Sequence, residues 1–266
     1  MHGRLSLPIF EAMKVQFEYL GQSYACDLTK AHDISIPLAA GGNRLSAWYV
    51  PPLSIEPVRA NGFVGAVAEG GSVNFRNIGF NPHGHGTHTE CVGHIAREVY
   101  SVNAALEQRL FVAQVVTVEP GILLEDFDNG RAGDSVIRAS DLPNELPEAL
   151  VLRTAPNSAS KTTRAYSDTN PPYLLAEAAS KIVSLGVEHL LIDLPSVDRE
   201  VDGGELRAHH LFWGWPAHPR KRATITELIY VDDAIDDGLY LLNLQTAPFE
   251  NDATPSRPVL YKAIRR

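Results

Sequence analysis

Short apolar runs rich in β-branched residues recur along the chain, and clusters of Gly and Pro separate them. Runs of this length between turn residues are typical of strands joined by loops, not of a helical bundle. On this pattern the sequence predicts strands in residues 15–24, 34–38, 112–118, 149–154, 187–193, 224–231 and 238–244.

One segment, residues 172–185, has the apolar spacing of a helix, and Gly186 follows it as a C-terminal stop. The predicted strand at residues 187–193 comes directly afterwards, so the two form a helix–strand unit. Strands that alternate with such a helix favour an α/β class with a mixed sheet. The apolar positions of the predicted helix are Leu174, Leu175, Ala178, Ala179, Ile182, Val183 and Leu185.

Three polar segments are predicted as loops. Residues 125–133 are acidic and small, residues 157–169 are rich in Ser and Thr without a hydrophobic period, and residues 246–258 follow the last predicted strand. The second of these is expected to be a surface loop or lid. The sequence shows no internal repeat and no linker, so we expect residues 1–266 to form a single domain.

Composition and charge exclude several functional classes. The chain has 23 basic and 32 acidic residues and a formal net charge of −9, with no extended basic run. A nucleic-acid partner is therefore not expected, since phosphate binding needs a concentrated basic face. The longest apolar runs are too short to span a bilayer, and no charged leader opens the chain, so we expect a cytoplasmic protein. Two cysteines, Cys26 and Cys91, fit a reducing compartment.

The densest chemistry lies in residues 81–94, which hold four of the ten histidines of the chain. Imidazole and carboxylate groups are typical ligands of zinc and manganese, and the intervening glycines allow a tight backbone. His88 and Glu90 are two residues apart, so in an extended segment they point to the same side. The alternative is a His-rich surface loop without metal, but the nearby carboxylate favours a metal site.

The run Gly86-Thr87-His88-Thr89-Glu90, followed by His94, resembles the signature of the cyclase family of metal-dependent hydrolases. This family includes bacterial kynurenine formamidases and isatin hydrolases. Its pattern also contains a later His on a helix and a Glu at a strand, for which His209 and Glu227 are the counterparts here. The resemblance extends over residues 30–245.

The resemblance implies a role for each matching residue. His88 and Glu90 are expected to bind the metal, and Glu90 can bridge two ions. His209 and Glu227 match the distal ligands, while His94 takes the position of the general acid/base. His210 is adjacent to His209, but neighbours on a helix point about 100° apart, so only one of them can face a metal.

The chain departs from the family pattern at three points. The first histidine of the family lies four residues before His88, where this chain has Gly84 between His83 and His85. Either histidine could replace it, and we favour His83. Glu90 stands where the family usually has Asp, and a proline usual before the last histidine is replaced by Val92-Gly93.

For the whole molecule, the resemblance implies a swivelling β/β/α fold and a homodimer or homotetramer. It also implies one or two zinc or manganese ions and a small aromatic amide as substrate. The expected activity is that of an arylformamidase, which hydrolyses N-formylkynurenine to kynurenine and formate in tryptophan catabolism. An isatin hydrolase-like activity on cyclic amides or lactones is the alternative within the family.

Two further hypotheses belong to other classes. In one, Cys91 is the nucleophile of a metal-independent hydrolase; in the other, the chain is a non-catalytic metal-binding relative. Asp193, Ser196 and Asp198 follow a predicted strand, where either a functional role or turn formation explains them. The candidates for an aromatic wall around the substrate are Phe75, Phe80, Tyr166, Trp213 and Trp215.

Overall fold

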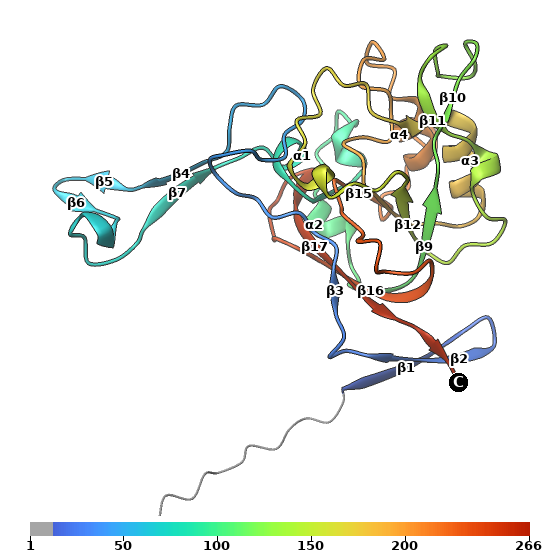
Figure 1. Ribbon diagram of the computed structural model, residues 1–266, viewed down its shortest axis with the longest axis horizontal. Helices are drawn as coiled ribbons and strands as arrows, with labels where there is room; N and C mark the ends of the chain where they lie inside the picture. Colours follow the sequence, from blue (N-terminus) through green and yellow to red (C-terminus); the bar gives the residue numbers. More distant parts are fainter. Residues whose placement is uncertain (1–12) are drawn as a thin grey trace, which may run out of the picture.

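A closed, mixed β-sheet forms the centre of the computed structural model, which describes residues 13–266 (Figure 1). Residues 1–12 of the predicted domain lie outside the described residues. The strands follow one another in the order β16-β9-β12-β14-β15-β8-β17, and pairing of β17 with β16 closes the barrel. These strands are β8 (His88–Glu90), β9 (Leu110–Val118), β12 (Ala149–Thr154), β14 (His189–Ile192), β15 (Thr224–Glu227), β16 (Gly238–Thr246) and β17 (Ala253–Lys262).

The four strands β9, β12, β14 and β15 are parallel neighbours, and the other barrel pairings are antiparallel. Strand β12 is buried along its whole length because both of its faces pack against apolar layers. Leu150 and Leu152 lie in the cluster shared with the helices, while Ala149 and Val151 lie in the cluster that fills the barrel. The predicted α/β class with a mixed sheet is confirmed.

Two helices, α3 (Ala176–Ser184) and α4 (Arg207–Trp213), cover one side of the barrel and contact each other. Helix α3 buries Ala178, Ala179 and Ile182 in the outer core. It ends before Gly186, whose φ of 83° is a left-handed conformation that glycine adopts at little cost. Two short helices, α1 (Pro82–His85) and α2 (Val102–Ala105), lie close to β17 and the residues just before it (Figure 1).

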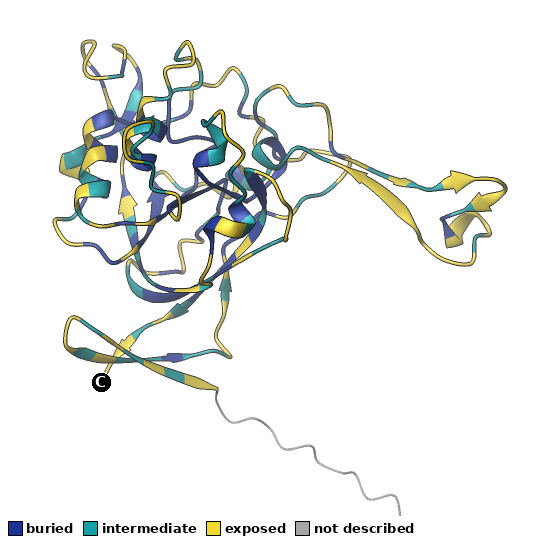
Figure 2. Cartoon of the chain, turned by 180° about the vertical axis from the view of Figure 1, so that it is seen from behind, coloured by how far each residue is buried: buried dark blue, intermediate teal, exposed yellow. Residues whose placement is uncertain are grey.

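An exposed arm, residues 54–79, extends from the barrel (Figure 2). Strands β4 (Ser54–Pro57) and β7 (Arg76–Gly79) pair along it, and β5 (Arg59–Ala60) pairs with β6 (Phe63–Val64) at its tip (Figure 1). The three-stranded sheet β1-β2-β18 also projects from the barrel (Figure 1). The strands β10, β11 and β13 form another three-stranded sheet. Within residues 13–266, no helix has both the length and the apolar character to cross a membrane. The remaining elements are β1 (Lys14–Tyr19), β2 (Gln22–Asp27), β3 (His32–Asp33), η1 (Val67–Glu69), η2 (Val92–His94), β10 (Gly121–Ile122), β11 (Ser135–Ile137), η3 (Ala139–Asp141), η4 (Ala159–Thr163), β13 (Tyr173–Leu174) and β18 (Ile264–Arg265).

The expected strand at residues 34–38 is wrong. Strand β3 precedes it, and only Ser35 forms an isolated bridge, with Ile229. Ile34 and Ile36 are buried and Leu38 is half-buried. The backbone of Ile36 is bonded to Thr87: the amide donates to Thr87 Oγ1 and the carbonyl accepts from the Thr87 amide. The predicted strand at residues 224–231 ends at Glu227, since Leu228 has a φ of 55°.

Two other boundaries differ for tertiary reasons. The predicted helix 172–185 begins at Ala176, because Tyr173 and Leu174 instead pair in parallel with β11. The segment 246–258, predicted as an exposed loop, contains the start of β17, which closes the barrel. Its polar and proline-rich composition does not indicate a strand, although alternate residues along β17 are buried.

His189 at the start of β14 gives the folded protein an acid-sensitive site. It is buried, its ring centroid lies 4.0 Å from that of Phe111, and its Nδ1 is 2.9 Å from Thr224 Oγ1. Burial, helped by the charges of Arg220 and Arg222, lowers the pKa of His189 from 6.5 to about 4. The stability that comes from the neutral ring is therefore present above pH 6.5 and is lost as the pH falls towards 4.

We expect His189→Gln to weaken this pH dependence, because glutamine does not titrate. Between pH 7 and pH 5 the wild type should lose about 2 kcal/mol more unfolding free energy than the variant. Urea unfolding at both pH values measures the difference, with the exposed His218→Gln as control. Equal losses in wild type and His189→Gln would contradict a depressed pKa.

Candidate metal centre

Strand β8 carries His88 and Glu90 between its antiparallel neighbours β15 and β17. Residues two apart in a strand point to the same face. The register pairs Glu227 with His88 and Ile225 with Glu90. Ile225 packs into the core that includes the helices, so the three polar side chains lie on this outer face of the barrel, towards α4.

Helix α4 brings His209 to the same point. Its Nε2 lies 3.2 Å from Glu90 Oε1 and 3.8 Å from Glu227 Oε1. Its Nδ1 lies 2.6 Å from Asp198 Oδ2, and the Asp198 carboxylate also accepts two backbone N–H groups at the start of α4. This carboxylate therefore holds both the helix end and the imidazole, while the side chain of His210 makes no hydrogen bond among the described residues.

The turn formed by α1 brings His83 to the other side of Glu90. The Asn81 side chain accepts a hydrogen bond from the His83 amide at 2.9 Å, and Pro82 favours the start of the helix. His83 Nδ1 lies 3.1 Å from Glu90 Oε2. His85 points elsewhere: its Nδ1 accepts from the Asn81 amide, and its Nε2 donates to the Pro51 carbonyl at 2.8 Å.

Gly84 explains why this chain has no histidine at the position where the family has one. A Cβ at residue 84 would lie 2.6 Å from a methyl carbon of Val50 and 2.9 Å from the Ala47 carbonyl oxygen. The Ala47 amide also donates to the Gly84 carbonyl. The backbone of α1 therefore packs too closely against residues 47–50 for any side chain, and His83 reaches Glu90 instead.

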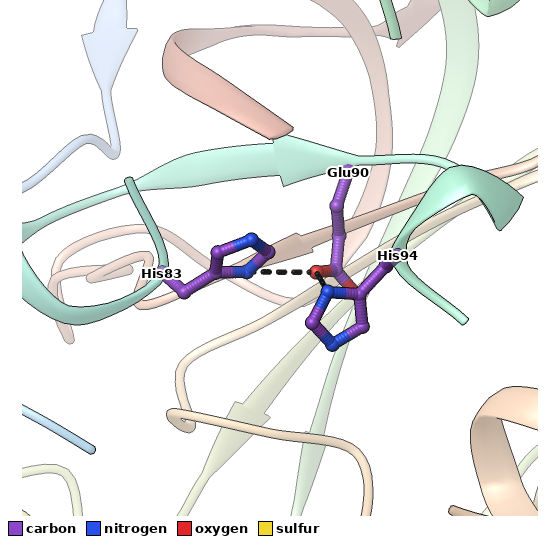
Figure 3. A group of neighbouring side chains, drawn as sticks. All are labelled: His83, Glu90 and His94. Carbon is purple, nitrogen blue, oxygen red and sulfur yellow. Dashed lines mark ion pairs between the residues drawn. The ribbon is translucent and has the colours of Figure 1, made fainter. Parts of the chain in front are cut away.

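His94 ends the 3-10 turn η2 and faces the same carboxylate (Figure 3). Its Nδ1 lies 3.6 Å from Glu90 Oε2 and 3.4 Å from Asp252 Oδ2. His83 contacts the same Asp252 oxygen through Nε2, at 3.2 Å. The two imidazoles are therefore placed side by side, with a ring-centroid distance of 4.5 Å.

The donor set fits a divalent cation. Two buried atoms, His88 Nε2 and Glu90 Oε2, make no hydrogen bond among the described residues, although Glu227 Oε2 lies 3.4 Å from the first and His83 Nδ1 lies 3.1 Å from the second. Such atoms are costly unless a further ligand satisfies them. Two groups of three side chains have donor atoms within 4.8 Å of one another, and both groups use Glu90. They are His83, Glu90 and His94, and His88, Glu90 and Glu227.

Without a metal, charged imidazoles balance the buried carboxylates. Burial opposes ionisation of Glu90, but His94 and His209 lower the pKa of Glu90 well below its usual value. Burial also disfavours the charged form of His209, yet Asp198 and Glu90 raise the pKa of His209 well above 6.5. For His83 burial is likewise outweighed, by Asp252 and Glu90, and the pKa of His83 rises to about 10. Metal binding at neutral pH must therefore displace protons.

A cavity of about 370 Å³ opens onto these side chains. Its lining combines the histidines and Glu227 with apolar groups and two small polar ones. These residues are Trp48, Val50, Asn81, His83, His94, Ser196, Leu206, His209 and Glu227.

The aromatic residue in the cavity wall is Trp48, which the sequence analysis did not select. The five aromatic candidates named there do not line this cavity. Phe75 is exposed on the arm, Phe80 stacks with Phe249, and Trp213 is buried beneath His209. The other two are Tyr166, which is buried in a separate core cluster, and Trp215, which packs against the outer core.

Cys91 is poorly placed for nucleophilic catalysis. Its side chain is fully buried, and the thiol donates to the Tyr100 carbonyl at 3.5 Å. Burial raises the pKa of Cys91 to about 11, so little thiolate forms at neutral pH. These observations argue against the metal-independent hypothesis.

Residues 26–199 match the family model described as a putative cyclase. The chain belongs to the cyclase family. The matched range includes His83, His88, Glu90 and His94, whereas His209 and Glu227 lie beyond it.

Two curated relatives are bacterial kynurenine formamidases. The protein from Bacillus cytotoxicus (strain DSM 22905 / CIP 110041 / 391-98 / NVH 391-98) is 28% identical over 192 residues, which cover 72% of this chain and 82% of the relative. The one from Bacillus cereus (strain ATCC 14579 / DSM 31 / CCUG 7414 / JCM 2152 / NBRC 15305 / NCIMB 9373 / NCTC 2599 / NRRL B-3711) is 27% identical over the same length, with the same coverage.

Solved structures of the family share the fold. Isatin hydrolase A from Ralstonia solanacearum has a TM-score of 0.61 at 14% identity, with 87% of this chain and 91% of that chain covered. A potential metal-dependent hydrolase with cyclase activity has a TM-score of 0.60 at 15% identity, with 87% and 97% covered. The cyclase fold expected from the sequence motif is therefore confirmed.

We expect zinc to stabilise the metal-free protein and Glu227→Gln to remove that effect. At a free zinc concentration 100 times Kd, binding adds about 2.7 kcal/mol, or roughly 5–10 °C in Tm. The variant keeps its size and the oxygen that accepts from the Val197 amide, so its metal-free Tm should not fall. Thermal melts with and without zinc measure both quantities.

His210→Ala, on α4, is the control, and zinc should raise its Tm as much as that of the wild type. A Glu227→Gln protein that gains as much Tm from zinc as the wild type would show that Glu227 does not bind the ion.

Proposed function

We propose that this protein is a metal-dependent amidohydrolase and that its substrate is an aryl formamide, N-formylkynurenine. The observation that supports this most strongly is the convergence of imidazoles and carboxylates on Glu90, where two buried ligand atoms make no hydrogen bond among the described residues. The converging residues are His83, His88, Glu90, His209 and Glu227. The cyclase family assignment and the two kynurenine formamidase relatives support a hydrolase.

The side chains that could bind an ion lie on two sides of Glu90. His83 can bind on one side, and His88 with Glu227 on the other, so Glu90 is the residue that one or two ions would share. Zinc or manganese bound here supplies Lewis acidity, which polarises a carbonyl and lowers the pKa of water towards about 7. Asp198 keeps His209 oriented through the bond to Nδ1, so that Nε2 faces the carboxylates.

His94 is the proposed general acid/base. It lines the cavity, and its side chain is 29% exposed, so it can meet a substrate, whereas His88 is fully buried. Hydrolysis of an amide requires a proton on the leaving nitrogen. An imidazole that takes a proton from water and passes it to this nitrogen performs both transfers.

The cavity suits a flat amide of modest size. Trp48, Val50 and Leu206 offer an apolar wall, and Asn81 and Ser196 offer polar groups for a carbonyl or amine. A cyclic amide such as isatin would meet the same groups, which keeps an isatin hydrolase-like activity as the second candidate. The homodimer or homotetramer and the cytoplasmic location also stay predictions.

His88→Ala and His94→Ala should separate metal binding from proton transfer. His88→Ala is expected to lose both bound metal and N-formylkynurenine hydrolysis. His94→Ala should keep its metal while kcat falls by about 10²–10⁴-fold, the usual contribution of a general acid/base. Metal content by mass spectrometry and initial rates on N-formylkynurenine and isatin measure these effects.

The exposed His218→Ala serves as the control and should match the wild type in both measurements. Metal-free wild type with full activity would contradict the mechanism. Faster turnover of isatin than of N-formylkynurenine would replace the proposed substrate with the second candidate.

Cys91→Ala tests the metal-independent hypothesis directly. We expect the variant to retain activity within about threefold, because the thiol is buried and bonded to a backbone carbonyl. Chelator treatment of the same variant should abolish its activity, and added zinc or manganese should restore it. Loss of activity in a folded, metal-loaded Cys91→Ala protein would instead favour the cysteine mechanism.

A further inference from the structure

Asp252 lies between two imidazoles of the candidate metal centre, although neither the family motif nor the matched residues 26–199 include it. One carboxylate oxygen, Oδ2, is 3.2 Å from His83 Nε2 and 3.4 Å from His94 Nδ1. The residue belongs to the segment just before β17, which the sequence pattern presented as an exposed loop.

We propose that Asp252 is a positioning residue that orients both His83 as a metal ligand and His94 as the acid/base. The inference rests on the proposed function, because it assigns the two histidines those roles. It adds that one carboxylate orients one imidazole for metal binding and the other for proton transfer.

The two ring nitrogens of His83 face two different carboxylates. Nδ1 faces Glu90 Oε2 at 3.1 Å, and Nε2 faces Asp252. Only Nδ1 can therefore reach a cation beside Glu90, and this nitrogen must then be unprotonated. The proton belongs on Nε2, where Asp252 accepts it. A carboxylate that fixes the tautomer of a ligating imidazole in this way strengthens metal binding.

His94 meets Asp252 through the nitrogen that could otherwise compete for the ion. Its Nδ1 is slightly closer to Asp252 Oδ2, at 3.4 Å, than to Glu90 Oε2, at 3.6 Å. With its proton on Nδ1, His94 would direct this nitrogen towards the Asp252 carboxylate and keep it off the metal. Nε2, which points away from Glu90 in Figure 3, is then the unprotonated nitrogen that can accept a proton.

The backbone holds Asp252 in place independently of its side chain. Its carbonyl accepts from the Cys91 amide at 3.0 Å, and the next residue, Ala253, pairs with Glu90 in the register of β17 and β8. The preceding carbonyl, of Asn251, accepts from the Val102 amide. Replacing the carboxylate should therefore leave the local fold unchanged and remove only its bonds to the imidazoles.

Asp252→Asn is the informative variant, because asparagine keeps the size of the side chain but removes the negative charge that both imidazoles face. Glu250→Gln, two residues earlier on the same segment, is the matched control, since Glu250 bonds Asn103 and not the metal centre. Zinc affinity is measured by chelator competition without substrate. Turnover of N-formylkynurenine is measured at saturating zinc. Two-bond ¹H–¹⁵N spectra of the imidazoles report which ring nitrogen carries the proton.

We expect Asp252→Asn to bind zinc about 10–100-fold more weakly than the wild type, the usual effect of losing such a partner. At saturating zinc its kcat should fall at least tenfold with little change in KM, and the tautomers of His83 and His94 should become mixed. Glu250→Gln should resemble the wild type in every measurement.

Unchanged zinc affinity in folded Asp252→Asn would overturn the assignment to His83. Unchanged kcat at saturating zinc would overturn the assignment to His94. In both cases wild-type zinc binding and hydrolysis would leave the proposed function intact, whereas a wild type that binds no zinc would overturn the proposed function as well.

Discussion

The pairing of β8 with both β15 and β17 is the constraint on which the rest of the site depends. A three-residue strand held on both edges fixes the direction of His88 and Glu90, and its register places Glu227 directly opposite His88. A slip of one residue would turn each of these side chains into the barrel interior, which is apolar. The sheet therefore determines which side chains can meet before any ion is involved.

Burying several ionisable groups in one place is unfavourable unless opposite charges or an ion compensate. In the metal-free protein the imidazoles provide the compensation, as the raised pKa of His83 and the lowered pKa of Glu90 show. Two ligand atoms at the centre, His88 Nε2 and Glu90 Oε2, nevertheless make no hydrogen bond among the described residues. This combination is typical of a site arranged for a ligand, not for stability alone.

Three histidines at the centre are each supported by a second group. Asp198 supports His209 and caps α4, Asn81 caps α1 beneath His83, and Asp252 contacts both His83 and His94. Asn81 lies close in sequence to the residue it supports, whereas Asp252 comes from a segment distant in sequence from both histidines. A metal site needs donor atoms placed to within a fraction of an ångström, and such placement requires rigid neighbours.

The sequence alone determined the elements whose signals are local. The β-branched run at residues 112–118 lies within β9, and the apolar run at residues 149–154 forms β12 over the expected residues. The His88–Glu90 spacing, with the cyclase motif, identified the donor types. Tertiary structure decided the rest. Close packing of residues 47–50 on Gly84 leaves no room for a side chain there, and the hydrogen bonds of His85 to Asn81 and Pro51 direct it away, so His83 is the histidine that faces Glu90. Closure of the barrel turned residues 253–262 into a strand and brought Asp252 to the histidines. These choices depend on contacts between segments far apart in the chain, which no local pattern of residues records.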